Sequence, residues 1–242
     1  MILINSAAYV NNEFRNEFGA IPPCFLPIGN RKLLTYQVKN LRNVFKEENI
    51  VVSLPRDYAL SIDEQELIQS LGIAPIFVPE GLSLGMAILY VWNTLGLYNQ
   101  PLRLLHGDTL LTDIPKDENC IAIVRTQDNY EWEFEENTNN PLVWCGYFSF
   151  AIAQNFIRAL ATTQGKFVES VHMYADEYNK SIHKEVFGWY DLGHINTYFR
   201  SRSAITTQRA FNNLKIENGI VWKSGSPAKK IEAEANWFAQ LP

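Results

Sequence analysis

The sequence contains only three cysteines, Cys24, Cys120 and Cys145, and no two of them have CxxC spacing. This pattern argues against both a disulfide framework and a zinc site of that type. Long hydrophobic runs are also missing, because no stretch approaches the roughly 18 apolar residues of a membrane span. Residues 1–8 are short and lack the basic start of a signal peptide. We therefore expect a cytoplasmic protein without a membrane span.

The sequence also has no excess of positive charge. The 21 Lys and Arg residues are outnumbered by 26 Asp and Glu residues, which gives a formal net charge of −5. This balance argues against a general nucleic-acid-binding protein, which would carry a basic face. A nucleotide ligand is still compatible, because a few local cations suffice for its phosphates. Hydrophobic residues make up 47% of the 242 residues, enough to fill the core of one large α/β domain or of a domain with a small appendage.

The first half of the chain alternates between apolar runs and helical patterns. Strands are predicted at 1–8, 49–54, 74–78 and 102–105, and helices at 32–46, 61–71 and 84–97. Residues 9–27 contain Gly19, three prolines and several asparagines, so they are predicted to form a loop. This order indicates an α/β fold with a doubly wound, mostly parallel, Rossmann-like sheet.

The second half of the chain is mixed rather than strictly alternating. Strands are predicted at 121–126 and 142–150, helices at 151–161, 166–179 and 195–202, and residues 130–140 are polar and acidic. No internal repeat interrupts either half.

Two aspartates are the most informative residues. Asp108 ends the apolar run LRLLHGD, and Asp191 follows 83 positions later in GWYDLGH. The first would project from the carboxyl edge of the sheet, where open α/β folds bind ligands. Mg²⁺ prefers oxygen ligands and usually takes only one or two protein carboxylates together with phosphate oxygens. We predict that the pair converges to hold Mg²⁺, although an aspartate alone after a strand is often a turn former or a helix cap.

Other candidates lie in the loops of such a fold. The first strand-to-helix loop would normally cradle phosphates with glycines. Here glycine is scarce, and the polar groups that could contact phosphates are Ser6, Asn11, Asn12 and Arg15. Arg31 and Lys32 add two cations further on, with ordinary solvated charge as the alternative interpretation. The segment PEGLSLGMA places three small residues, Gly81, Ser83 and Gly85, where they could approach a nucleobase or merely form tight turns.

Several chemically capable side chains are given structural roles. His106 and His194 each lie within three residues of an aspartate, but imidazole suits softer metals than Mg²⁺. His106 is therefore predicted to be structural or to contact the substrate, and His194 to form a hydrogen bond at the start of a helix. Cys24 and Cys145 have no base partner in the sequence, so they are predicted to be core residues. Among the aromatics of the 142–150 strand, Trp144 and Tyr147 belong to the core or face a substrate.

These motifs resemble those of the sugar-nucleotidyltransferase family. The counterparts are the 9–34 loop ending FLPIGNRKLL, Gly107-Asp108, Gly146-Tyr147-Phe148 and Asp191-Leu192-Gly193. The resemblance covers residues 1–205 and is strongest to a divergent capsule-associated branch. It implies a nucleotide-diphospho-sugar transferase type of fold with Mg²⁺ as cofactor.

The resemblance also suggests roles for individual residues. Candidate catalytic residues are Asp108, Asp191 and Arg15, with the two aspartates as metal ligands; candidate nucleotide-binding residues are Ala7, Ala8, Tyr9, Asn11, Gly81, Ser83, Gly85 and Gly107; candidate substrate-binding residues are Arg31, Lys32, Trp144, Gly146 and Tyr147. The chain departs from the family's LAAGxGxR loop, because Tyr9 and Asn11 replace glycines and Arg15 comes two places late. Cys24 also replaces the lysine of the family's Pro-Lys pair, and the E-K-P segment has no clear match.

Residues 206–242 resemble the first strands and helix of a small-molecule kinase, in which a strand lysine pairs with a helix glutamate. The corresponding residues are Lys223 and either Glu232 or Glu234. No catalytic loop of such a kinase is present, so we expect no kinase activity from these residues. They belong to a bifunctional protein, or are a retained piece, or form a hairpin and helix that pack on the main domain.

The expected activity joins a nucleoside triphosphate, with CTP or UTP favoured, to a phosphorylated small acceptor and releases pyrophosphate. Capsule or surface-polysaccharide precursor synthesis is the expected setting, and a homo-oligomer is possible. One alternative is an inactive nucleotide-binding or regulatory domain. Another is a GT-A-type glycosyltransferase, which the absence of a D-x-D motif after Gly107 disfavours.

Overall fold

The computed structural model describes residues 1–126, 128, 133–135, 141–178, 181–207, 212–217, 220–225 and 228–240. Its first half contains β1 (Ile2–Asn5), α1 (Asn12–Phe18), a 3-10 turn (Pro23–Phe25), β2 (Pro27–Ile28), β3 (Arg31–Lys32), α2 (Leu33–Val44), β4 (Ile50–Pro55), α3 (Ile62–Ser70), β5 (Ala74–Val78), α4 (Leu84–Leu95), β6 (Leu102–His106) and β7 (Thr109–Leu111). Its second half contains β8 (Cys120–Arg125), β9 (Glu133–Glu135), β10 (Leu142–Phe150), α5 (Ala153–Thr162), α6 (Phe167–Asp176), β11 (His183–Glu185), β12 (Trp189–Asp191), α7 (Ile195–Thr207), β13 (Asn212–Glu217), β14 (Ile220–Gly225) and α8 (Ala228–Ala239).

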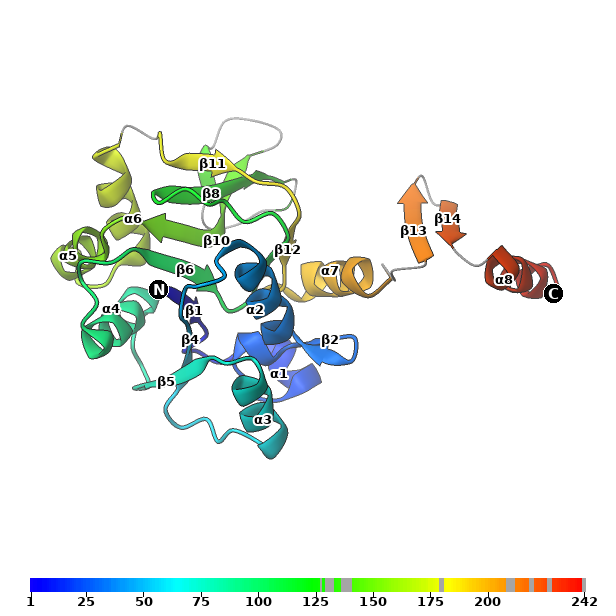
Figure 1. The fold of residues 1–242 in the computed structure, drawn as a ribbon, viewed down its shortest axis with the longest axis horizontal. Coiled ribbons are helices and arrows are strands. Elements are labelled where there is room, and N and C mark those ends of the chain that lie inside the picture. Colours follow the sequence, from blue (N-terminus) through cyan, green and yellow to red (C-terminus); the bar gives the residue numbers. More distant parts are fainter. Residues whose placement is uncertain are drawn as a thin grey trace.

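A mostly parallel sheet forms the centre of the α/β fold (Figure 1). The strand order is β11-β8-β10-β6-β1-β4-β5, with β9 added beside β10. Strands β6, β1, β4 and β5 run parallel to one another, whereas β10 runs antiparallel to β6 and β8. The predicted doubly wound sheet with a mixed second half is confirmed.

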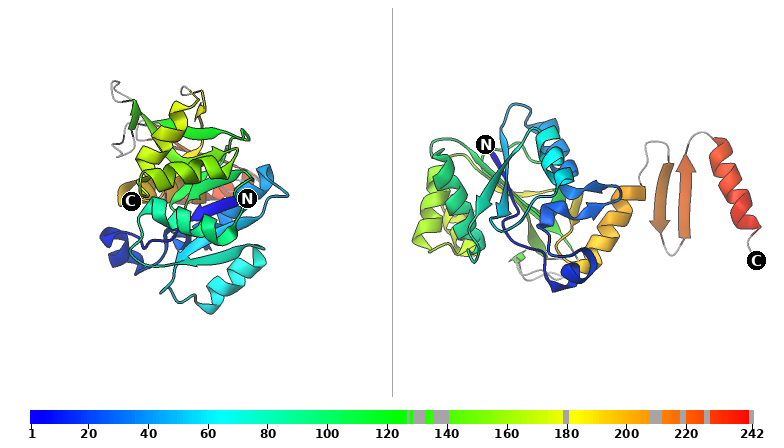
Figure 2. Two further views of the ribbon diagram at one scale, coloured as in Figure 1. Left: turned by 90° about the vertical axis from the view of Figure 1, so that its left-hand side faces the viewer. Right: turned by 90° about the horizontal axis from the view of Figure 1, so that it is seen from below.

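Helices cover both faces of the sheet, as the right-hand view of Figure 2 shows. Side chains from α4, α5 and α6 pack on one face together with Leu3, Val51 and Leu104. Side chains from α2 and α3 pack on the other face together with Ile4 and Val52. Because successive strand residues point to opposite faces, strands buried on both sides are apolar at nearly every position.

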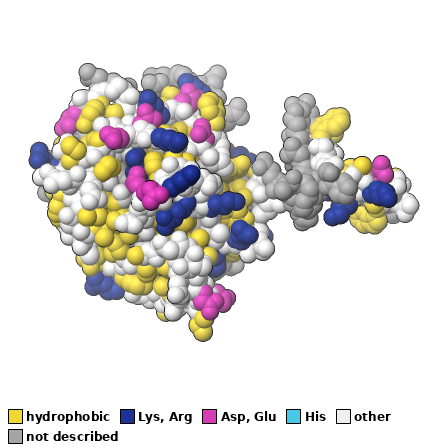
Figure 3. Space-filling model, in the orientation of Figure 1, with side chains coloured by type: hydrophobic (Ala, Val, Ile, Leu, Met, Phe, Trp, Pro, Cys, Tyr) yellow, Lys and Arg dark blue, Asp and Glu magenta, His cyan; other side chains and the backbone are white. Residues whose placement is uncertain are grey.

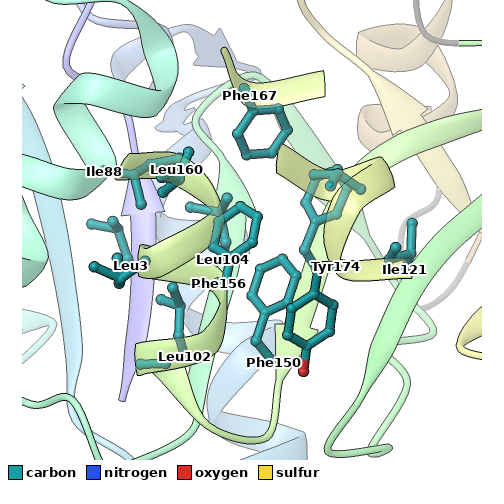
Figure 4. Packing of buried hydrophobic residues seen from close by; sticks show 14 of the residues in the cluster. Leu3, Ile88, Leu102, Leu104, Ile121, Phe150, Phe156, Leu160, Phe167 and Tyr174 are labelled. Carbon is teal, nitrogen blue, oxygen red and sulfur yellow. The ribbon is translucent and has the colours of Figure 1, made fainter. Parts of the chain in front are cut away.

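Stacked aromatic rings fill the core under α5 and α6 (Figure 4). The ring centroids of Phe150 and Phe156 are 3.8 Å apart with nearly parallel planes. Tyr174 meets Phe150 edge-on at 4.8 Å, and its hydroxyl donates to Asn119 in the loop before β8. The aromatic residues of β10 therefore anchor both helices to the sheet.

A half-buried ion pair closes the amino edge of the sheet. Glu48 accepts from the Arg103 guanidinium at 2.8 Å and from the N-terminal ammonium at 2.9 Å. Burial raises the pKa of Glu48, but the hydrogen bonds from Arg103 and the N-terminus outweigh burial and hold this pKa below its ordinary value.

Glu48→Gln should therefore lower the free energy of unfolding near pH 7 by about 1–3 kcal/mol, because the charge-assisted bonds are lost. A depressed carboxyl pKa stabilises the fold above the unfolded pKa and ceases to do so as the pH falls through the folded one. The stability difference between wild type and variant should thus shrink below about pH 4. Urea titrations at pH 7 and pH 3.5 measure this stability difference. An equal difference at both pH values would contradict a stabilising role of the ionised Glu48 carboxylate.

Residues 9–27 are not entirely loop, contrary to the sequence prediction. The side chain of Asn11 caps α1 by accepting from the Phe14 backbone N–H at 3.2 Å, and the Phe14 ring packs edge-on against Tyr198 at 5.3 Å. This helix of seven residues is too short to show a clear apolar period. It forms because its one buried ring docks on α7.

Three further differences concern short elements. Strands β7, β11 and β12 have only three residues each and were not predicted; β7 and β12 pair with each other outside the main sheet. Of the predicted polar segment 130–140, only β9 lies within the described residues.

The hairpin β13–β14 and helix α8 follow α7 and lie apart from the helices that cover the sheet (Figures 1 and 2). Lys223 of β14 forms an ion pair with Glu234 of α8, the second of the two glutamates expected to pair with it. Trp222, Trp237 and Phe238 are exposed on this unit. Among the helices of the described residues, none combines the length and the apolar composition that a membrane span requires.

Candidate active site

Three neighbouring parallel strands carry polar residues in one row at the carboxyl edge of the sheet. Asn5 of β1 lies in register with Ser53 of β4 on one side and with His106 of β6 on the other. Two residues earlier the same row consists of Leu3, Val51 and Leu104, which face α4 and α5. The three polar side chains therefore share the α4 side of the sheet.

A chain of hydrogen bonds orients the Asn5 side chain. The Ser6 backbone N–H donates to the Ser53 hydroxyl at 3.0 Å, and that hydroxyl donates to the Asn5 carbonyl oxygen Oδ1 at 2.8 Å. This arrangement leaves the Asn5 amide N–H₂ available to a ligand. Burial lowers the pKa of His106 to about 4, so its ring is neutral near pH 7.

The loops after β1 and β6 are in close contact, and this contact requires a glycine. The Gly107 N–H donates to the Asn5 carbonyl at 2.8 Å. A Cβ at Gly107 would lie 2.6 Å from the Ser6 hydroxyl oxygen and 3.0 Å from the Asn5 carbonyl oxygen. Any larger residue at 107 would separate the two loops that border the site.

Asp108 and Asp191 meet beside this edge. Strand pairing places Asp191 opposite Thr109, and the Leu192 N–H donates to the Asp108 carbonyl at 2.9 Å. The position of an ideal Cβ on Gly193 lies 2.6 Å from Asp108 Oδ2 and 3.4 Å from Asp191 Oδ1, so these oxygens are at most about 6 Å apart. The glycine leaves open the space between the two carboxylates.

The Asp191 carboxylate is held by three donors. Its Oδ1 accepts from the Gly193 N–H at 3.0 Å, and its Oδ2 accepts from Thr197 and contacts the His194 ring nitrogen Nδ1 at 2.8 Å. These contacts orient the Asp191 carboxylate.

The electrostatics of the pair favour a cation. Burial and the charge of Asp191 raise the pKa of Asp108 to about 6. Two carboxylates this close repel each other, and a positive ion placed between them would remove the repulsion. The two residues fit Mg²⁺, which requires few protein carboxylates and keeps waters and phosphate oxygens as other ligands. Among the described residues there is no cluster of three or more His, Cys, Asp and Glu side chains that would indicate a different metal centre.

A cavity of about 260 Å³ opens beside Asp108. Its polar lining comes from Asn5, Ser6, His106, Gly107 and Asp108, and its apolar lining from Ala7, Ala8, Pro23, Leu82, Leu84 and Ala87. The structure thus brings four predicted residues, Ala7, Ala8, Gly107 and Asp108, to one cavity. This volume is slightly below that of typical small-molecule sites, so it suits part of a nucleotide rather than all of it.

The three small residues of the 79–87 segment have separate roles at its border. Gly81 has φ +75° and open space around it. Ser83 caps α4 and donates to the Gly165 carbonyl at 3.2 Å. A Cβ at Gly85 would lie 2.3 Å from that carbonyl oxygen, so Gly85 allows α4 to pack against the α5–α6 turn. Their neighbours Leu82 and Leu84 are the residues that line the cavity.

Tyr9 and Asn11 do not line this cavity. Asn11 caps α1, and the Tyr9 ring meets Tyr58 edge-on at 6.1 Å. Cys24, which stands where the resemblance calls for a lysine, is fully buried, and burial raises the pKa of its thiol to about 12. Cys145 is buried as well, which confirms the core role predicted for both cysteines.

The three predicted cations lie elsewhere. Arg15 is exposed on α1, where its Nε donates to the Val10 carbonyl at 2.9 Å. Arg31 and Lys32 line a second cavity at the start of α2, where the Lys32 ammonium lies 3.6 Å from the Glu64 carboxylate. Figure 3 shows several Lys and Arg side chains over α2 and beside the β2–β3 hairpin. No Lys or Arg is among the described residues that line the Asp108 cavity.

The predicted substrate-binding residues of β10 are divided between the two faces of the sheet. Tyr147 is fully buried on the α2 side, and its hydroxyl donates to the Pro115 carbonyl at 3.2 Å. Trp144 is nearly buried on the opposite side, 4.8 Å from the His172 ring. Gly146 has φ +85°, and a Cβ there would lie 2.6 Å from the Thr109 hydroxyl oxygen. Gly146 therefore belongs to the Asp108 neighbourhood, and Tyr147 to the core.

Sequence reasoning overlooked Asn5 and Ser53. Each is the only polar residue in an otherwise apolar strand segment, ILIN or IVVSLP. Near the carboxyl ends of three buried strands, β1, β4 and β6, the sequence has a polar residue, and this shared feature could have indicated the site.

No protein-family model and no curated protein matches the sequence. The fold does match solved structures. A nucleoside-diphosphate-sugar pyrophosphorylase from Vibrio cholerae has a TM-score of 0.62 at 12% identity, covering 84% of this chain and 99% of its own. A UTP-bound UGPase from Acinetobacter baumannii has a TM-score of 0.62 at 12% identity, covering 100% and 99%. HddC from Yersinia pseudotuberculosis has a TM-score of 0.58 at 14% identity, covering 84% and 98%.

Proposed function

We propose that this chain is a Mg²⁺-dependent nucleotidyltransferase that joins a nucleoside triphosphate to a phosphorylated small acceptor. The observation that carries the proposal is the convergence of Asp108 and Asp191 beside a cavity at the carboxyl edge of the sheet. The fold shared with a pyrophosphorylase and a UTP-bound UGPase supports it. Sugar phosphates, polyol phosphates and related groups are all compatible acceptors.

In this reaction an acceptor phosphate oxygen attacks the α-phosphorus of the triphosphate, and pyrophosphate leaves with the electrons of the broken P–O bond. An acceptor phosphate is already nucleophilic near pH 7, so the site needs no Ser-His pair. Asp108 and Asp191 would hold Mg²⁺, which supplies positive charge to the phosphate oxygens. Asn5 would help to position the nucleotide, and Gly107 allows the loops after β1 and β6 to stay in contact.

The cavity beside Asp108 suits an uncharged group better than a phosphate. Its apolar lining consists of alanines, leucines and a proline, one of its polar lining residues is the Asp108 carboxylate, and none of its described lining residues is a Lys or Arg. A phosphate buried there would be left without an opposite charge, which is costly. The base of the nucleotide would enter the cavity, and the phosphates would remain near the two aspartates. A pyrimidine nucleotide, CTP or UTP, is favoured by the resemblance to the capsule-associated branch.

Asn5→Leu should weaken the binding of MgUTP or MgCTP by about tenfold, because it removes an amide donor at a cost of roughly 1.4 kcal/mol. Calorimetric titration of wild type and variant measures the change. Magnesium tripolyphosphate, which has no base, should bind both proteins equally. Equal loss of nucleotide and tripolyphosphate would contradict a contact between Asn5 and the base.

The direct test of the function is a nucleotide screen. CTP, UTP, dTTP and GTP are added with and without Mg²⁺, first to measure thermal shift and then, with phosphorylated acceptors, to measure pyrophosphate release. Mg²⁺-dependent stabilisation by one nucleotide followed by pyrophosphate release is expected. No nucleotide-dependent shift with any of the four would contradict the proposal, since a ligand that binds the native state must stabilise it.

A nucleotide-binding domain without transfer activity is the second candidate. It is favoured by the positions of Arg15, Arg31 and Lys32, the three cations expected to contact the triphosphate, because none of them lines the Asp108 cavity. Binding of a nucleotide with no pyrophosphate release from any phosphorylated acceptor would favour this candidate.

We further propose a role in capsule or surface-polysaccharide precursor synthesis and a kinase-like origin for residues 206–242. The first is supported by the resemblance of residues 7–30 to the capsule-associated branch. The second is supported by the Lys223–Glu234 ion pair between strand and helix.

A further inference from the structure

A buried amide on helix α2 makes contact with the backbone around Asp108. Gln37 is 1% exposed. Its side-chain nitrogen Nε2 donates to the carbonyl oxygens of His106 at 3.1 Å, Gly107 at 3.1 Å and Thr109 at 2.8 Å. Carbonyl oxygens only accept hydrogen bonds, so the orientation of this amide is unambiguous.

The remaining carbonyl of this turn is also fixed. The Leu192 N–H donates to the Asp108 carbonyl at 2.9 Å. All four consecutive carbonyls, from 106 to 109, therefore have a partner outside the turn: Gln37 for three of them and the Asp191 loop for the fourth. With its backbone held on both sides, the direction of the Asp108 side chain is set.

The oxygen of the Gln37 amide is in a different environment from its nitrogen. Its oxygen Oε1 is buried with no hydrogen-bond partner among the described residues. A buried acceptor without a donor destabilises the fold, and native proteins keep few of them.

We propose that Gln37 is a positioning residue that holds the Asp108 carboxylate within metal-binding distance of Asp191. The inference rests on the proposed function, because it assumes that the two aspartates share a cation. Gln37 does not touch the cation or the substrate and acts only through the backbone of residues 106–109.

The same helix provides a matched control. Asn40 lies one turn further along α2 and donates from its side-chain nitrogen to the Leu111 carbonyl at 2.8 Å. Like the Gln37 bonds, this bond joins α2 to the backbone that follows β6, but its acceptor lies in β7, three residues after Asp108. Loss of either amide weakens the attachment of β7 to α2, and only loss of Gln37 releases the Asp108 turn.

The experiment measures Mn²⁺ binding by electron paramagnetic resonance in wild type, Gln37→Met and Asn40→Leu, without nucleotide. Gln37→Met should raise the dissociation constant about tenfold, the lower range for loss of a group that supports a metal ligand. Asn40→Leu should leave it unchanged, although both variants melt at lower temperature. Excess Mg²⁺ should restore the turnover of Gln37→Met, which a purely structural defect would not allow.

Unchanged Mn²⁺ affinity in Gln37→Met, or an equal loss in both variants, would overturn the positioning role. If Gln37→Met does not fold, Gln37→Asn keeps the amide but shortens its reach, and the same comparison applies. A wild-type protein that binds no Mn²⁺ overturns the metal site itself, and the inference with it. If wild type binds Mn²⁺ and the Gln37 variants bind it equally well, the positioning role of Gln37 is wrong and the metal site stands.

Discussion

Replacing Asp108 with asparagine should lower the rate of pyrophosphate release at least about 10³-fold, since a metal's charge stabilisation is worth several kcal/mol. The same variant should be more stable than wild type without metal. Burial and the charge of Asp191 raise the pKa of Asp108 to about 6, so the ionised carboxylate is unfavourable in the folded protein. A neutral amide removes that cost.

The sign of the pH dependence follows from the same shift. Because the folded pKa lies above the unfolded one, the stability contributed by the protonated form is present at low pH and is lost as the pH rises to about 6. Wild type in chelator should lose this contribution between about pH 4 and pH 6, and Asp108→Asn should not.

Asp113→Asn is the matched control for this prediction. Asp113 is an exposed aspartate five residues further along, so its replacement should change neither turnover nor this pH dependence. Urea titrations and pyrophosphate assays of the three proteins give both readouts. Full activity in Asp108→Asn would exclude the metal role.

The Gly193→Ala variant should lower turnover by about 10²-fold, the effect of misplacing reacting groups by about 1 Å. Its new Cβ would lie 2.6 Å from Asp108 Oδ2 and 3.4 Å from Asp191 Oδ1. The first distance is shorter than any normal contact, so the Asp108 carboxylate must move away from the cation position. The backbone at Gly193 does not have the positive φ that disfavours alanine, so the steric contact is the main effect.

Gly96→Ala separates this effect from a general loss of stability. Gly96 ends α4 with φ +67° and has no atom within 4 Å of an added Cβ. Its replacement should cost about 1–2 kcal/mol of stability through backbone strain and leave turnover unchanged. Melting temperatures and steady-state rates of both variants test the comparison. A Gly193→Ala enzyme with wild-type turnover would show that the carboxylates do not work as a pair at this distance.

The sequence predicts the central fold because its buried strands and amphipathic helices have clear periods. The 142–150 strand and the 74–78 strand agree with β10 and β5 residue for residue. Short elements were missed for a physical reason: α1 and the three-residue strands β7 and β12 are too short for a period, and they form through tertiary contacts.

The candidate site was predicted in part. The positions of Asp108 and Asp191 after apolar segments were sufficient to suggest that they meet. The sequence did not show that Arg31 and Lys32 lie away from Asp108, because their distance from it depends on the β2–β3 hairpin and on the Glu64 carboxylate. Gln37 could not be recognised, since a glutamine on a helix reveals its buried partners only when the backbone of the sheet is in place.

The most direct measurement is the number of Mn²⁺ ions bound per chain in wild type, Asp108→Asn and Asp191→Asn. The convergence of the two carboxylates predicts one Mn²⁺ in wild type, whose affinity falls at least about tenfold when either aspartate is replaced. Wild-type affinity in both variants would contradict a cation shared between Asp108 and Asp191.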